Sequence, residues 1–343
     1  TNKDGTPSKG SDIDYNGQHA GYAQDPIEIQ NYVSKHDNQT IFDIIAYKAD
    51  SSISADTRIR MQAVSLATVM LGQGTVFDQQ GSELLRSKSF ERDSYDSGDW
   101  YNKVDYTKAG NNFDVGLPRK DKDESNYDLI KQVKPSVVKP DTAAINEMES
   151  FYKELTALRA SSPLFTLGSG SEVMKRVDFR NVGPDQKTGV IAMTIDDGTA
   201  VSDLDKKIDG AVVIINATPN SQTIGDFKDA DGNALALSGY ALSSVQSDLG
   251  TASIGQGSTF DNGEFTVPAW SAAVFVKAQG DAQGAGLPVG KKQDLSTLPP
   301  FGDTAVYLPG TLIGNWDFTD ANLFAFSGAG YSSALSTTLA APN

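Results

Sequence analysis

The sequence contains no cysteine and only two histidines, His19 and His36. Without cysteine, the chain can form neither a disulfide nor a thiolate metal site. A histidine-rich zinc site is nearly excluded too, because two imidazoles are too few for one. No run of about 18 apolar residues occurs, which excludes a transmembrane helix.

Positive charge is scarce. Lys and Arg number 29 against 44 Asp and Glu, which gives a formal net charge of −15. This balance opposes binding to nucleic-acid phosphates and to anionic membranes. It suits a soluble protein that acts on neutral partners such as sugars, although acidity that only keeps a protein soluble is the simpler explanation.

The first residues also lack two features. The opening stretch, TNKDGTPSKG, has neither an initiator Met nor the apolar core of a signal peptide. We therefore expect Thr1 to be the start of a fragment or a processed piece. The expected partner of this chain is then the missing N-terminal part of the same protein. At 343 residues, of which 38% are hydrophobic, the chain is long enough for two or three domains.

The first half of the chain alternates predicted strands and helices. Residues 27–35 and the stretch 74–81, GTVFDQQG, have the composition of buried strands. Between them, residues 55–71 place apolar side chains at spacings of three and four and are followed by Gly72, which predicts a helix. A helix between two such strands is a βαβ unit, which favours a parallel sheet.

A long polar segment, residues 81–140, separates this unit from a second predicted helix. It has no clear period, but Trp100 and several tyrosines argue against disorder. Residues 141–160 then carry a strong apolar face, with Asp141 or Thr142 as the expected N-cap.

The pattern changes after residue 162. Short β-branched or aromatic segments separated by Gly, Asn and Asp are typical of an antiparallel sandwich. They lie near residues 172–180, 189–195, 210–216, 264–267 and 270–276. Residues 279–302 have the composition of a linker. Residues 303–343 begin as new strands and stop early. The stretch VYLPGTLIGNWDFTDANLFAFSG resembles the opening strands of starch-binding or immunoglobulin-like modules, so we expect an incomplete β module with Trp316 as a core aromatic or a sugar platform.

One short motif, YVSKHDNQT at residues 32–40, stands where a predicted strand ends. Active sites of parallel barrels form at the carboxyl ends of the strands. There, Asp37 could supply a carboxylate for acid–base or cation-stabilising work, and His36 a donor to a hydroxyl group. A structural His–Asp pair fits the same residues equally well.

Longer motifs resemble a known family. YVSKHDNQT resembles the fourth conserved region of the α-amylase superfamily, glycoside hydrolase family thirteen, as type I pullulanases and limit dextrinases have it. Four further stretches carry the same resemblance, which covers about residues 10–285: RMQAVSLATVMLGQGTVFDQQGSELLRSKSFERDSYDSGDWYNKVDY, FYKELTALRASSPLFTLG, VMKRVDFRN and VPAWSAAVF. It is strongest to bacterial secreted pullulanases, which implies cleavage of α-1,6-glucosidic bonds in pullulan, amylopectin and limit dextrins.

The resemblance assigns roles to two residues. Asp37 matches the aspartate that stabilises an oxocarbenium-like transition state, and His36 matches the histidine that bonds sugar hydroxyls. Retaining glycosidases also need a nucleophile and a proton donor. The Phe-Arg-Phe-Asp and Gly-Glu-Gly-Trp types of motif that carry these in the family are absent. We therefore expect the chain to be inactive by itself.

Further substrate-binding candidates lie near these two. Arg86, Asp93, Asp99 and Trp100 belong to a loop that the resemblance puts beside the site, where they either shape the cleft or order the loop. Asn38 and Tyr32 either contact substrate or support residues that do. Lys35 is expected to be structural.

The expected fold is α/β plus all-β. Residues 1–162 form the C-terminal part of a (β/α)8 barrel, with its seventh and eighth strands, and residues 163–278 form an antiparallel β-sandwich. The resemblance implies a secreted or cell-surface parent protein, in which a structural calcium ion is an open possibility. The acidic stretch 121–128 has calcium-like spacing but lacks the Gly and distal Glu of an EF-hand, so a solvated loop is favoured.

Two other functions stay open at this point. The chain could be a non-catalytic glucan-binding or scaffold piece, or it could belong to an α-1,4-acting relative of the amylases. The residue sequences around His36 and Asp93 argue against an α-1,4-acting relative.

Overall fold

The structure is a computed structural model that describes residues 13–21, 23–229 and 232–290 together with three short strands further on. It divides into two units. One is Asp25–Lys291, and the other combines Thr1–Gln24 with Lys292–Asn343. Both hydrophobic cores lie in the first unit.

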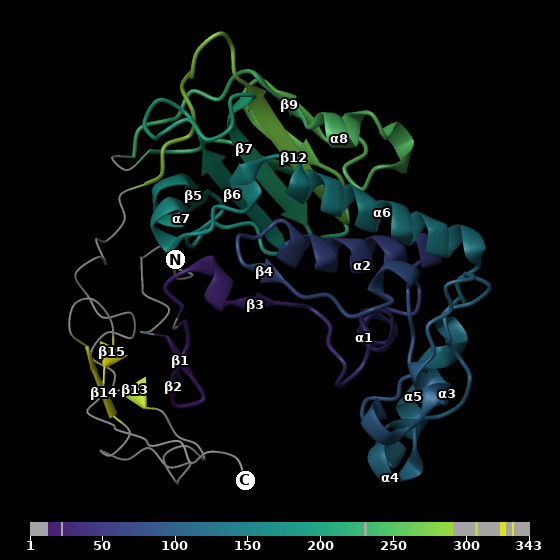
Figure 1. The fold of residues 1–343 in the computed structure, drawn as a ribbon. Helices are drawn as coiled ribbons and strands as arrows, with labels where there is room; N and C mark the ends of the chain where they lie inside the picture. The colour runs from purple at the N-terminus through teal and green to yellow at the C-terminus, as the bar shows by residue number, and fades with distance from the viewer. Residues whose placement is uncertain are drawn as a thin grey trace. The chain divides into compact units, whose positions relative to one another are not determined.

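The helical half of that unit is built on α1 (Ile41–Lys48), α2 (Ala55–Met70) and α6 (Thr142–Ala160). The helices predicted over 55–71 and 141–160 are thus confirmed. Ser54 caps α2 by accepting from the Thr57 N–H, and Asp141 caps α6 by accepting from the Ala144 N–H. The two helices pack side by side (Figure 1). Their buried faces form the centre of the larger core.

The two strands expected at 27–35 and 74–81 are much shorter than predicted. They are β3 (Gln30–Asn31) and β4 (Thr75–Val76), which pair in parallel with Gln30 opposite Thr75. Residues Pro26–Glu28 form a 3-10 turn, η2, instead of strand. A strand extends only as far as a neighbour hydrogen-bonds to it, and among the described strands each of these two has one neighbour. The described residues contain a single parallel pair and no closed barrel.

The segment 81–140 is ordered by short helices and by packed aromatic rings. Its longer helical pieces are α3 (Asp99–Asn102), α4 (Lys120–Asp123) and α5 (Tyr127–Val133). Its 3-10 turns are η3 (Ser82–Leu84), η4 (Ser94–Asp96), η5 (Glu124–Asn126) and η6 (Lys134–Ser136). Phe90 and Phe113 are buried with ring centroids 5.7 Å apart, so apolar contacts hold the segment in place of a regular period.

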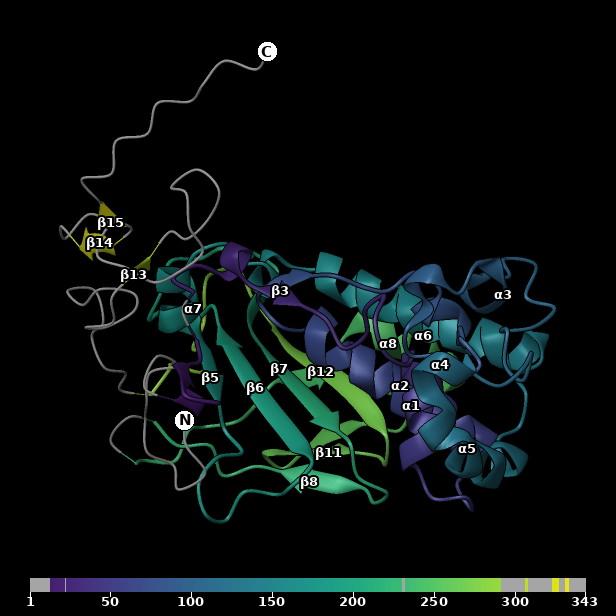
Figure 2. The ribbon, with the colours of Figure 1, turned by 90° about the horizontal axis from the view of Figure 1, so that it is seen from below.

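An antiparallel sandwich follows, as the sequence predicts. Its larger sheet has the order β5-β6-β7-β12-β9, and its smaller sheet has the order β10-β11-β8. Figure 2 shows β5, β6, β7 and β12 of the larger sheet together with β8 and β11 of the smaller. The larger sheet consists of β5 (Val177–Phe179), β6 (Val190–Asp196), β7 (Ile208–Asn216), β12 (Ser271–Ala278) and β9 (Tyr240–Leu242). The smaller consists of β10 (Thr259–Asp261), β11 (Glu264–Val267) and β8 (Gln222–Ile224). The second core lies between them, where Phe265 of one sheet meets Phe275 of the other.

The expectation of a strand over 172–180 is wrong for most of that range. Helix α7 (Gly170–Arg176) precedes the three residues of β5. The Ser169 side chain accepts from the Glu172 N–H and caps this helix, and Lys175 and Arg176 occupy its last turn. The remaining short helices of the unit are η7 (Pro163–Phe165), α8 (Ser244–Ser247) and η8 (Gly250–Ala252).

Residues 279–290, within the stretch expected to be a linker, pack against the ends of β6 and β7. Asp209 Oδ1 accepts from the Gly284 N–H at 2.7 Å, and Asp196 Oδ1 accepts from the Leu287 N–H at 2.8 Å. Leu287 is buried in the second core. Up to residue 290, the chain is therefore bound to the sandwich.

The second unit is described only as strands. β1 (Asp14–Tyr15) and β2 (Gln18–His19) form a hairpin, in which His19 stands opposite Asp14. β13 (Val306–Tyr307), β14 (Leu323–Phe326) and β15 (Tyr331–Ser332) form an antiparallel sheet. Trp316 lies outside the described residues. Among the described helices, none combines the length and apolar character needed to span a bilayer.

Candidate functional site

Asp37 lies in the turn between β3 and α1, with its side chain half exposed at 49%. Lys35 Nζ is 2.9 Å from Asp37 Oδ2, and His36 Nδ1 is 3.3 Å from Asp37 Oδ1. The hydrogen bond from Lys35 is the largest cause that lowers the pKa of Asp37 below its usual range, and the nearby charges lower it further. The carboxylate therefore stays ionised in mild acid, as a group that stabilises positive charge must.

The turn that carries Asp37 is fixed through its backbone. Asn38 has a left-handed conformation with φ of 59°, and its N–H donates to the Arg92 carbonyl at 2.7 Å. The His36 carbonyl accepts from Lys88 Nζ at 2.9 Å, while the His36 imidazole is 84% exposed. The backbone is thus held, and the side chains of the two candidate residues are exposed.

A cleft of about 690 Å³ opens beside this turn. Among the predicted residues, Tyr32, His36 and Arg86 line it. Asp37 and Asn38 belong to the adjoining turn. The other lining residues are Gln30, Ser34, Lys35, Phe77, Asp78, Gln79, Gln80, Ser94, Tyr95 and Asn102.

Arg86 serves the cleft mainly by ordering its wall. Its Nη1 donates to the Gln80 carbonyl at 3.0 Å and its Nη2 to the Asn102 carbonyl at 2.8 Å. Burial lowers the pKa of Arg86, yet a guanidinium keeps its charge at any ordinary pH. Arg86 therefore brings a positive charge and a fixed loop to the same wall.

The other three loop candidates lie outside the lining of the cleft. Asp93 forms an ion pair with Lys122, with 3.0 Å between Oδ2 and Nζ. Asp99 begins α3. Trp100 is 62% exposed, and its Nε1 donates to the Val115 carbonyl at 3.0 Å. In the described structure, these contacts order the loop.

Asp78 is a cleft residue that the sequence reasoning missed. It follows β4, and burial raises its pKa to about 6. A signal for it existed, because the carboxyl ends of parallel strands meet at one edge of a sheet. Asp37 follows β3 and Asp78 follows β4 at that same edge. Ser34 and Gln79 also join the two strand ends, with 2.5 Å between Oγ and Oε1.

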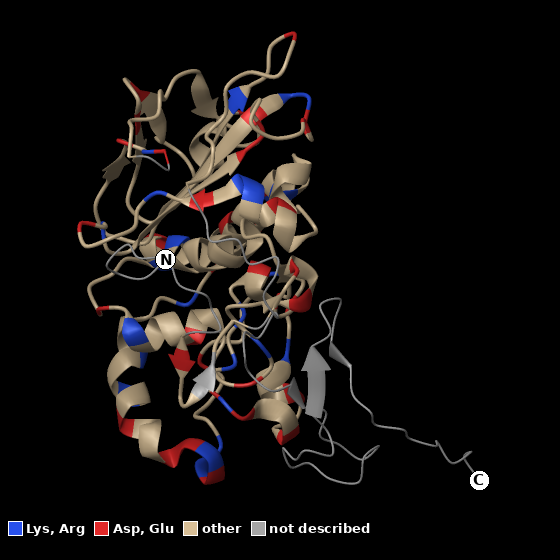
Figure 3. Ribbon diagram, turned by 90° about the vertical axis from the view of Figure 1, so that its left-hand side faces the viewer, with Lys and Arg blue, Asp and Glu red and all other residues tan. Residues whose placement is uncertain are grey.

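The acidic stretch 121–128 is engaged in ion pairs and helix ends. Asp121 pairs with Arg119 at 2.8 Å, and Asp123 accepts from Asn126 at 2.5 Å. Lys and Asp alternate along α4 (Figure 3). Within the residues that the structure describes, no three His, Asp or Glu side chains gather where they could hold a metal ion.

Comparisons with known proteins agree on one family. Residues 108–278 match the model of the C-terminal domain of α-1,6-glucosidases of the pullulanase type. A pullulanase from Klebsiella pneumoniae is 58% identical over 292 residues, which are 84% of this chain and 26% of that protein. A chloroplastic pullulanase of Arabidopsis thaliana is 39% identical over 81% of this chain and 29% of its own length.

Solved structures give the same result. The crystal structure of apo pullulanase from Klebsiella pneumoniae superposes with a TM-score of 0.79 at 58% identity, over 84% of this chain and 31% of that one. The structure of the Klebsiella pneumoniae enzyme complexed with maltotriose has a TM-score of 0.79 at 57% identity, over 84% and 27% of the two chains. The chain thus spans between a quarter and a third of these relatives.

Proposed function

Because the chain belongs to the pullulanase-type α-1,6-glucosidases, we propose that it is the C-terminal part of a starch-debranching enzyme. The enzyme hydrolyses α-1,6-glucosidic bonds in pullulan, amylopectin and limit dextrins with retention of configuration. In this proposal, β3 and β4 are the seventh and eighth strands of a (β/α)8 barrel. The parallel pairing of the two strands around α1 and α2 supports it.

The observation that carries the proposal is the position and charge of Asp37. Its carboxylate stands in the turn that follows β3, beside the cleft, with a lowered pKa. Positive charge develops at the anomeric carbon as the glycosidic bond breaks. A fixed carboxylate stabilises that charge more in the transition state than in the ground state, and so accelerates the reaction.

His36 and the cleft aromatics have supporting roles in this mechanism. The exposed imidazole of His36 can donate to a hydroxyl of the distorted sugar ring. Tyr32, Phe77 and Tyr95 line the cleft and offer flat apolar surfaces on which sugar rings stack. Asn38 supports the site through its backbone.

The remaining catalytic groups come from outside this chain. A retaining glycosidase needs a nucleophile and a proton donor about 5 Å apart. We assign both to a preceding part of the complete enzyme, since the family motifs for them are absent here. The complete enzyme acts outside the cell or at its surface.

Replacing Asp37 with Asn in the complete enzyme tests the proposal. We expect kcat for pullulan to fall at least about 100-fold, because the variant loses a charge aimed at the transition state. Affinity for maltotriose, measured by calorimetry, should change little. The matched control is Asp50→Asn, another exposed carboxylate, which is bound to Ser52 and lies away from the cleft lining. Near-normal turnover by the Asp37 variant would refute the assignment.

A further inference from the structure

Lys88 is a buried lysine whose ammonium group is aimed at the turn that carries Asp37. The residue is 1% exposed. Its Nζ donates to the His36 carbonyl at 2.9 Å and to Ser94 Oγ at 3.1 Å. Burial lowers the pKa of Lys88, since a charge removed from water is costly. A charge is retained in such a place only where its partners are fixed.

Asp43 of α1 fixes the loop from which Lys88 projects. This aspartate is fully buried. Its Oδ1 accepts from Ser87 Oγ at 2.5 Å, and its Oδ2 accepts from the Lys88 N–H at 2.8 Å. The next two residues, Ser89 and Phe90, have φ of 52° and 68°, a conformation that non-glycine residues adopt only when their surroundings hold them in it. The base of the Lys88 side chain is therefore anchored to α1.

The same loop holds the turn of Asp37 at two points. Lys88 Nζ binds the carbonyl immediately before Asp37, and the Arg92 carbonyl binds the N–H immediately after it, that of Asn38. The first bond is charge-assisted and is the stronger kind. The charge of Lys88 also helps to lower the pKa of Asp37.

A purely space-filling role does not explain this arrangement. An apolar side chain of similar length would fill the position without the cost of a buried charge. Within the described residues, Lys88 forms no ion pair shorter than 4.0 Å, although Asp43 and Glu91 are close enough to affect its pKa. The ammonium group of Lys88 instead donates hydrogen bonds to the His36 carbonyl in the candidate site and to Ser94 Oγ.

We propose that Lys88 is a positioning residue, which relays the fixed position of α1 through Asp43 and its own ammonium to the backbone immediately before Asp37. The inference rests on the proposed role of Asp37. Misplacing a catalytic group by about 1 Å can cost about 100-fold in rate. Loss of the ammonium should therefore act on turnover more than on binding.

The test is Lys88→Met in the complete enzyme. We expect kcat for pullulan to fall about 10- to 100-fold, with KM changed less than about threefold. Hydrogen exchange of peptides covering residues 34–40 should become at least about tenfold faster, because the turn loses one of its two backbone anchors. Lys88→Arg, which keeps a charged donor, should recover part of kcat. The matched control is Lys108→Met, another partly buried lysine, which binds Asn146 and Glu149.

Two results would overturn the inference. One is an unchanged kcat together with unchanged exchange at residues 34–40 in Lys88→Met. The other is a loss of kcat no larger than that of Lys108→Met at an equal loss of thermal stability. If Lys88→Met does not fold, Lys88→Gln keeps a neutral donor and should still lower kcat at least about fivefold. Full activity in a folded Gln variant would equally refute it. The Asp37→Asn test of the proposed function does not involve Lys88. Its result therefore shows whether the proposed function fails or only the role of Lys88.

Discussion

The carboxylate of Glu154, on α6, accepts a hydrogen bond from the backbone N–H of Ile254, which lies 100 residues further along the chain, at 2.9 Å. Glu154 is buried, and its other oxygen accepts from Gln246 Nε2 at 2.6 Å and from Ser253 Oγ at 2.8 Å. At the carbonyl of the same residue, Arg60 Nη2 of α2 donates to Ile254 at 2.7 Å. Two helices of the helical half thus hold one loop of the sandwich, which joins the two halves into one unit.

Glu154→Ala should lower the free energy of unfolding by about 3 kcal/mol. The substitution removes the acceptor of three buried hydrogen bonds, and each donor hydrogen left unsatisfied costs free energy. Glu154→Gln, which keeps one acceptor oxygen, should cost about half as much. Urea denaturation measures both. The control is Glu149→Ala on the same helix, whose surface ion pairs with Lys108 and Lys153 predict a loss below about 1 kcal/mol. Equal losses in the Ala variants would show that the carboxylate does not join the halves.

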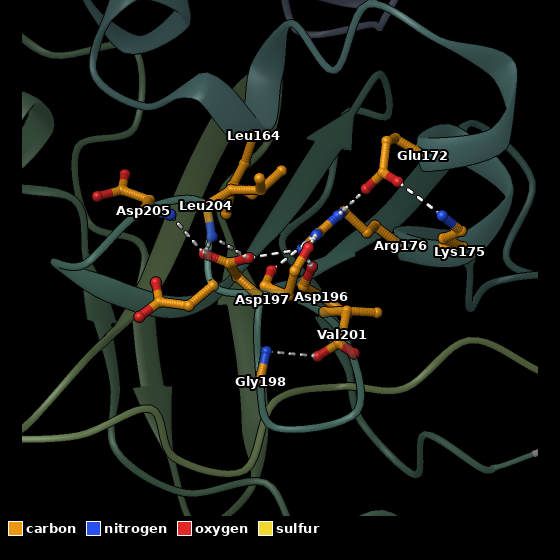
Figure 4. A network of polar contacts seen from close by, with 12 residues as sticks. Leu164, Glu172, Lys175, Arg176, Asp196, Asp197, Gly198, Val201, Leu204 and Asp205 are labelled. Carbon is orange, nitrogen blue, oxygen red and sulfur yellow. Dashed lines mark hydrogen bonds and ion pairs between the residues drawn. The ribbon is translucent and has the colours of Figure 1, made fainter.

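Arg176 is the second buried charge on which the sandwich depends (Figure 4). Its Nη1 is 2.5 Å from Asp197 Oδ1, and both side chains are fully buried. Arg176→Met leaves the Asp197 carboxylate buried without its cation, so we expect a loss of about 3 to 5 kcal/mol in urea denaturation. Lys175→Met, at the exposed neighbour that pairs with Glu172, should cost less than about 1 kcal/mol. A small loss for both variants would contradict the prediction.

The raised pKa of Asp78 predicts that the free energy of unfolding depends on pH. Its pKa in the folded chain is raised from 3.8 to about 6, chiefly by burial. Because the folded chain holds this proton more tightly, the stabilisation is complete below pH 3.8 and is lost as pH rises through about 6. Asp78→Asn, which carries no charge, should therefore gain up to about 3 kcal/mol relative to the natural chain between pH 4 and pH 7. Urea denaturation across this range checks it, and a difference that does not vary with pH would contradict it.

The titration of Asp37 should depend on Lys35. The hydrogen bond from Lys35 is the largest cause that lowers the pKa of Asp37. Lys35→Met should thus raise that pKa toward its ordinary value, so that Asp37 becomes protonated at a higher pH. NMR detection of the Asp37 carboxyl carbon measures the shift directly. Lys120→Met is the control, since this exposed lysine pairs with Glu124 instead. An unchanged titration in the Lys35 variant would assign the effect to the other neighbouring charges.

The sequence predicted the elements that depend on local signals. The helices ending at Met70 and Ala160 follow from apolar spacing and from their capping residues. The central strands of the sandwich follow from runs of β-branched residues. Helix α1 escaped notice because it has only eight residues, and a short, mostly apolar stretch fits a buried strand as well as a helix. Helix α7 was not predicted because the sequence signal for it is the capping residue Ser169 and not the spacing of its apolar residues.

The candidate site was predicted unevenly for the same reason. The motif at residues 32–40 predicted Asp37 and His36 as site residues directly from the order of residues, and this assignment stays a prediction. The loop residues Asp93, Asp99 and Trp100 were predicted either to shape the cleft or to order the loop. They lie outside the cleft lining, which contains Asp78 and Tyr95 from outside that prediction. Which side chains of a loop face a cleft depends on how the loop folds back, and a segment without a period does not encode this locally.

By itself, the sequence determined the main helices, the antiparallel character of the second half and the residues around Asp37, because each is set by neighbours a few positions apart. The tertiary structure decided how short the parallel strands are, that residues 279–290 bind the sandwich, and which lysine holds the turn of Asp37. The bond from Lys88 to His36 spans 52 residues, and that from Glu154 to Ile254 spans 100. Such contacts form only when the chain has closed on itself, so no local pattern of residues records them.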